Sequence, residues 1–181
     1  MKIKRLWKYI LADMDRAFIS WKFPFAIAGV FMILEFAAFE SRQWHFSVLN
    51  TFHLVIYSMP FLLSLIFTTL VYGQCFCEDM EHQYIRMLVM RGNLRLYTIA
   101  KVITLMVSSV AVMALGVLLF AGVLRLQYPW IDIEIGGSDY EILLQDGSFR
   151  EILRHGNFSL YFLLCGIQYG IFAGVMSIVA A

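Results

Sequence analysis

The chain has 181 residues, of which 61% are hydrophobic and 15% charged, and its mean hydropathy is +0.74. Too little polar surface is available to cover so much apolar mass, so this composition excludes an ordinary water-soluble domain and indicates an integral membrane protein. The net charge of +1 says nothing about a partner, and we expect the lipid bilayer, not nucleic acid, around the chain.

The first 22 residues combine a basic region with an apolar face that recurs at helical spacing. This pattern is typical of an interfacial helix that lies in the headgroup plane, with Trp7 and Trp21 at a suitable depth. Pro24 then stands where a new helix begins, because its fixed φ and missing N–H are tolerated in a first turn. We therefore expect residues 1–22 to form an elbow before the first span; a simple extension of that span is the alternative.

Four apolar runs approach or exceed the length of about 20 residues that crosses a bilayer core of about 30 Å. The sequence therefore predicts an all-α, polytopic helical membrane protein with a single transmembrane domain. The third run is long enough to tilt or to project beyond the bilayer, and Pro60 predicts a kink in the second. The predicted spans are residues 23–39, 54–73, 99–124 and 158–181.

Between the second and third spans, residues 74–98 contain ordered charges. The acids Glu78, Asp79 and Glu81 precede Arg86 and Arg91, as the dipole of a short helix favours, and Gly92 and Asn93 supply a stop. Apolar residues recur every three or four positions on the other face. We expect one amphipathic helix whose charged face is open to a partner.

Residues 125–157 form the only other sizeable segment outside the spans. Ser138-x-x-Glu141 and Ser148-x-x-Glu151 match the capping box of a helix start, and the second helix should end at Gly156. The segment is acidic, which is compatible either with plain solvation or with a cationic substrate.

The basic residues are unevenly divided between the two sides of the spans. Because Lys and Arg concentrate on the cytoplasmic side, the N-terminus and residues 74–98 are expected in the cytoplasm of a cell whose plasma membrane holds the chain. Ten of the 14 Lys and Arg residues lie on that side, leaving only Arg42, Arg125, Arg150 and Arg154 on the other.

Polar residues inside the spans are candidates for a translocation path. Glu35 in the first span would cost a few kcal/mol if ionised and facing lipid, so it faces a cavity, a partner charge or the outer interface. Gln168 and Tyr169 in the fourth span either hydrogen-bond to other helices or line a path. Beside them a stripe of small residues permits close helix packing, within the bundle or in a dimer, at Gly166, Gly170 and Gly174.

Motifs that would carry chemistry in this chain are missing from its sequence. It has no P-loop, zinc-protease or nucleophile-elbow motif, and its four His residues are scattered. We therefore expect no catalytic residue, no metal site and no cofactor in this chain, which would make it a non-enzymatic subunit.

Two stretches carry a resemblance to a known family. The sequence F-C-E-D-M-E-x-x-Y-I-R at 76–86 and R-G-N-x-R-x-Y-x-x-x-K at 91–101, after a basic amphipathic helix, resemble the permease subunits of bacterial ABC exporters of the type-2 fold. The layout agrees over nearly the whole chain, although such permeases usually have six spans. The four found here imply either part of a longer polypeptide or a four-span relative.

The resemblance implies a function and partners. Residues 74–98 would be the coupling segment that docks on a separate cytoplasmic ABC ATPase holding ATP and Mg²⁺, and a second permease subunit, identical or related, would complete the exporter. Its cargo would be a peptide, a lipid or a drug-like amphiphile. A non-transporting membrane anchor or sensor that recruits a cytoplasmic protein is the alternative. The coupling residues would be Glu78, Asp79, Glu81, Arg86, Arg91, Arg95, Tyr97 and Lys101.

Overall fold

The structure is a computed structural model, and every regular element in the residues that it describes is a helix. Three of these helices are long and apolar enough to cross a membrane, and a bent pair of shorter helices makes a fourth candidate span. The expected helical membrane protein is confirmed at this level. The residues described are 2–40, 47–69, 94–131 and 149–180.

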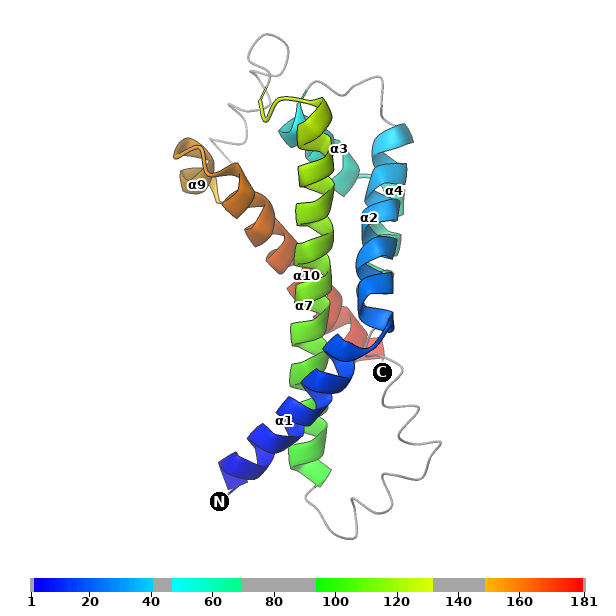
Figure 1. Ribbon diagram of the computed structural model, residues 1–181, viewed down its shortest axis with the longest axis vertical. Coiled ribbons are helices and arrows are strands. Elements are labelled where there is room, and N and C mark those ends of the chain that lie inside the picture. Colours follow the sequence, from blue (N-terminus) through cyan, green and yellow to red (C-terminus); the bar gives the residue numbers. More distant parts are fainter. Residues whose placement is uncertain (1, 41–46, 70–93, 132–148, 181) are drawn as a thin grey trace.

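The long helix α7 (Leu94–Gln127) is the axis of the bundle. It contacts α1, α2, α4 and α10 (Figure 1). With 34 residues and a rise of about 1.5 Å per residue, it is about 51 Å long, well beyond the roughly 30 Å of a bilayer core. The helix extends past both ends of the predicted span 99–124, as expected of a span that tilts or projects.

At the N-terminus, α1 (Lys2–Ile19) and α2 (Lys22–Glu40) are separate helices. The chain breaks at Ser20 and Trp21, where the backbone N–H of Lys22 donates to the Ser20 hydroxyl oxygen over 3.3 Å. Pro24 lies in the first turn of α2, so its missing N–H leaves no helical bond unmade. The elbow and the position of α1 in the headgroup plane stay predictions.

The described part of the second predicted span, residues 54–73, falls on two helices instead of one. The helix α3 (Val48–Ile56) begins six residues earlier, and α4 (Met59–Thr69) leaves it at an angle of 81°. The Ser58 hydroxyl donates to the Val55 carbonyl over 2.6 Å at the break. Pro60 has no N–H to donate to the carbonyl four residues before it, so α3 cannot continue through this position, whereas Pro is tolerated in the first turn of α4. The expected kink is therefore a sharp corner, which makes this pair a broken span or a re-entrant loop.

The N-terminus of α3 is tied to the chain that leaves α7. The Ser47 side chain caps the helix by accepting from the Asn50 N–H over 3.1 Å. Two further N–H groups of the first turn donate to distant carbonyls, Val48 to Pro129 over 3.0 Å and Leu49 to Trp130 over 3.3 Å. A helix start leaves four N–H groups without helical partners. These bonds give the N–H groups of Val48, Leu49 and Asn50 partners outside the helix.

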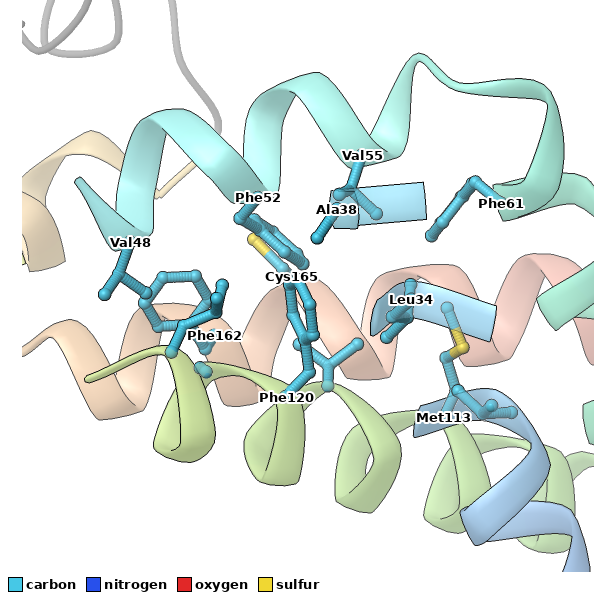
Figure 2. Close-up of a cluster of buried hydrophobic side chains, with 14 of the residues drawn as sticks. Leu34, Ala38, Val48, Phe52, Val55, Phe61, Met113, Phe120, Phe162 and Cys165 are labelled. Carbon is cyan, nitrogen blue, oxygen red and sulfur yellow. The ribbon is translucent and has the colours of Figure 1, made fainter. Parts of the chain in front are cut away.

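The core lies where α3 crosses the ends of α2, α7 and α10. Phe52 of α3 and Phe162 of α10 are fully buried, with their rings edge to face and their centroids 5.0 Å apart. Figure 2 shows Leu34 of α2, Phe120 of α7 and Cys165 of α10 in the same cluster. One apolar cluster thus joins six of the described helices, α2, α3, α4, α7, α9 and α10.

The helix α10 (Phe158–Ala180) packs obliquely against α7 (Figure 1). A Cβ added at Gly170 would stand 2.6 Å from the Val110 Cα, and one at Gly166 would stand 2.7 Å from the Ala114 Cα. Ser109 also donates to the Gly170 carbonyl over 3.1 Å. The glycine stripe therefore serves packing within the bundle, which was one of the two expected uses.

A short helix, α9 (Arg150–Arg154), precedes α10. Its N-cap is Phe149 in the left-handed conformation, with a φ of 60° and no side-chain cap, one residue after the N-cap that the sequence predicts. Gly156 has a φ of +73° and ends the helix as predicted, because glycine adopts that conformation without steric cost. Ser138 and Ser148 lie outside the described residues.

Candidate functional site

The expected coupling residues divide into two groups. Glu78, Asp79, Glu81, Arg86 and Arg91 lie outside the described residues. The remaining three, Arg95, Tyr97 and Lys101, lie on the first two turns of α7. Arg95 is exposed, whereas Tyr97 and Lys101 are buried, with only 3% and 6% of their surfaces exposed. The first two turns of α7, which we call its root, are therefore partly buried, and the helix that packs against them is α1.

Beneath α1, Lys101 forms a buried ion pair with Asp13. The ammonium nitrogen Nζ of Lys101 lies 3.1 Å from Oδ1 of Asp13, and the two side chains are 8% and 11% exposed. The same nitrogen lies 5.3 Å from the centre of the Tyr97 ring, within cation–π range. Ala17 and Leu105 form a small apolar cluster from the same two helices. We call Asp13, Tyr97 and Lys101 the inner clamp.

Burial makes the inner clamp sensitive to the loss of either charge. Two charges removed from water attract strongly at short range, but their desolvation offsets much of the gain. Removal of one partner leaves an unpaired buried charge, which costs about 3–5 kcal/mol in soluble proteins. The pair therefore specifies how α1 lies on α7 more than it stabilises the fold.

Asp13 was not singled out from the sequence, although a signal was present. It occupies the same helical face as Ile10 and Ala17, three residues before and four residues after, and both of those side chains are buried. An acid on the apolar face of an amphipathic helix needs a cationic partner. A basic residue on an apolar run elsewhere, Lys101, was the natural candidate for that partner.

At the other end of the bundle, α2 and the end of α7 line a groove with a volume of about 390 Å³. Its floor includes Ala38 and Leu124, which are buried, while Met32 and Phe36 are exposed at its rim. Glu35 contributes a carboxyl group, and Gln127 and Tyr128 contribute further polar atoms. We call this feature the outer groove.

Glu35 is half-buried in the outer groove, and its oxygen Oε1 is fully buried. Among the described residues, none provides a hydrogen bond to that oxygen. A buried polar atom without a partner costs free energy, so this carboxyl is a site that a proton or a cation would stabilise. A groove is present beside Glu35, while the other two expected surroundings, a partner charge and the outer interface, stay predictions.

Gln168 and Tyr169, the other expected path residues, lie on α10 and do not line the outer groove. Gln168 is exposed, and Tyr169 packs its ring edge to face against Phe61 of α4, with centroids 5.0 Å apart. Tyr169 therefore has a packing role between α10 and α4. A path that joins these residues to Glu35 stays a prediction.

Metal-ligating side chains do not cluster in the parts of the chain that the structure describes. No group of three His, Cys, Asp or Glu side chains gathers there as a metal site requires. The Cys165 thiol is buried in the apolar core.

Comparison with known proteins gives no relative: no family model, no curated protein and no solved structure matches the chain.

Proposed function

We propose that this chain is the permease subunit of an ATP-driven exporter of the ABC type, set in the plasma membrane with its N-terminus in the cytoplasm. In this proposal a separate ATPase binds ATP and Mg²⁺ and docks on residues 74–98, and a second permease subunit completes the transporter. The charge order of residues 76–101 and their resemblance to type-2 permeases support it.

The observation that carries the proposal is the inner clamp. It joins α1 to α7 within eight residues of the first residue of α7. A partner that displaces residues 74–98 would move this root, and a buried ion pair resists sliding because neither charge tolerates separation from the other. Motion of the root would then carry α1 with it.

The continuity of α7 supplies the second part of the mechanism. One unbroken helix of 34 residues runs from the root to the outer groove, where Leu124 and Gln127 line the wall. A tilt of the helix at its root changes the distance between its far end and α2. ATP-driven docking could in this way open and close the outer groove.

Copurification tests this proposal. The tagged chain, extracted with detergent from its native cells, should bring down an ATPase at fixed stoichiometry. The double change Asp79→Lys with Glu81→Lys should reduce the ATPase recovered per permease by about tenfold or more, since reversed charges at a docking contact oppose binding. The matched control is Glu151→Lys, an exposed acid in α9, which should leave recovery unchanged.

Two results would contradict the proposal. Wild-type recovery and ATP turnover in the double-lysine variant would remove residues 74–98 from coupling. Recovery of a cytoplasmic protein that does not hydrolyse ATP would instead support the membrane anchor or sensor.

A further inference from the structure

We propose that the outer groove binds a lipophilic organic cation, with the Glu35 carboxylate facing its positive charge. This inference rests on the proposed function in so far as it names the class of exported substrate, but the binding site itself stands on the geometry of α2 and α7.

The outer groove has one formal charge and no cation of its own among the described residues that line it. Glu35 is the one acid in the span Lys22–Phe39, and its Oε1 is buried without a hydrogen-bond partner in the described structure. The basic residue nearest in sequence to the α7 wall is Arg125, which does not line the groove. Its guanidinium donates to the backbone carbonyl of Tyr128 over 3.3 Å and lies 5.3 Å from the Trp130 ring. Among the described residues, none that lines the groove carries a positive charge that would neutralise this carboxylate.

The walls of the groove indicate what kind of cation fits. Phe36 and Tyr128 offer aromatic rings and Met32 a polarisable thioether, all of which favour a large, weakly hydrated cation. Ca²⁺ takes six to eight oxygen ligands and Mg²⁺ gives up its bound waters reluctantly, whereas this wall is largely apolar and has one carboxylate beside Gln127 and Tyr128. The volume of about 390 Å³ falls within the range of small-molecule sites. Charge and shape together favour an amphiphilic organic cation over an inorganic ion.

The position of the groove also suits a ligand that arrives from the membrane. Met32 and Phe36 are 65% and 58% exposed in the isolated chain, so the rim opens sideways onto the surface that lipid would cover. A hydrophobic cation dissolves at that depth and loses little solvation when it enters. An anionic or strongly polar ligand would gain nothing there.

Direct binding to the purified full chain tests the inference without any ATPase. Tetraphenylphosphonium is the probe, and triphenylphosphine oxide, which is uncharged and has similar rings, is the matched ligand control. Glu35→Gln keeps the side-chain shape and removes the charge, so the cation should bind on the order of tenfold more weakly while the neutral compound is unaffected. Glu151→Gln removes the same charge at an exposed site and should change neither.

A second variant keeps the test decisive if Glu35→Gln lowers the yield of folded protein. Phe36→Leu alters only an exposed rim ring and should weaken cation binding about two- to fivefold, as the loss of a cation–π contact predicts. Equal cation affinity in wild type and Glu35→Gln, or an equal effect on the neutral compound, would overturn the inference, as would the absence of binding.

Failure of this inference and failure of the proposed function give different results. Carboxylate-dependent binding without a copurifying ATPase would leave the cation site standing and remove the exporter. A copurifying ATPase together with charge-independent binding would support the exporter and contradict the cation site.

Discussion

The inner clamp should respond to mutation in a way that an ordinary surface ion pair would not. At 3.1 Å, two unit charges attract by about 5 kcal/mol with an effective dielectric constant of about 20. We expect Asp13→Leu and Lys101→Met each to lower the free energy of unfolding by about 3 kcal/mol, because each leaves the other charge buried and unpaired. The low end of the range for buried pairs applies to Asp13→Leu, since the Tyr97 ring still faces the ammonium.

The double variant distinguishes this reasoning from simple loss of packing. When Asp13→Leu and Lys101→Met are combined, no unpaired charge remains, and apolar side chains fill the same contact. The double variant should therefore cost less than either single change, which gives a coupling free energy of at least about 3 kcal/mol. Additive effects would instead mean that the two side chains contribute independently.

The measurement is reversible unfolding of the purified chain in detergent, followed by tryptophan fluorescence, with Trp7 in α1 as one reporter. Asp15→Leu is the matched control, because it removes the same charge from the exposed face of the same helix and should stay within about 0.5 kcal/mol of wild type. If Asp13→Leu behaves as Asp15→Leu does, the clamp does not exist as described.

Three further outcomes are expected. Gly170→Ala should destabilise the bundle by about 1–3 kcal/mol, because the added Cβ forces α10 away from α7. The control Gly122→Ala has no atom within 4 Å of the added Cβ and should be neutral or stabilising. Equal melting temperatures for the two variants would refute the packing role. Phe52→Ala should cost about 3–5 kcal/mol in a denaturation assay, and a loss below 1 kcal/mol would contradict a well-packed core. In a cysteine-free background, Glu151→Cys in intact cells should react with a membrane-impermeant thiol reagent and Asp15→Cys should not; the opposite pattern would invert the topology.

The spans were predictable because the bilayer sets their length. Apolar runs of about 20 residues identified α2 and α10 almost to the residue. The run predicted for α7 was shorter than the helix at both ends. The corner between α3 and α4 was not predictable as such. Pro60 indicated a kink, but a turn of 81° depends on where the N–H groups of α3 find carbonyls, and those belong to Pro129 and Trp130, far along the chain.

The candidate site was predictable in part for a related reason. Glu35 stood out because an acid in an apolar run is costly wherever it lies. Lys101 was assigned to coupling by resemblance, but its contact in the structure is Asp13, 88 residues away. The helical pattern of α1 shows only that Asp13 lies on the apolar face; which basic residue it meets depends on the packing of α1 against α7.

The bonds from α3 to Pro129 and Trp130 also impose an order on biogenesis. As the chain leaves the ribosome, α3 and α4 are complete long before residues 129 and 130 have been made. Until then, the Val48 and Leu49 N–H groups need water or another transient partner, since a buried N–H without a hydrogen bond costs free energy. The first 69 residues therefore cannot reach their final arrangement alone, and α3 should settle into place only after α7 has been inserted.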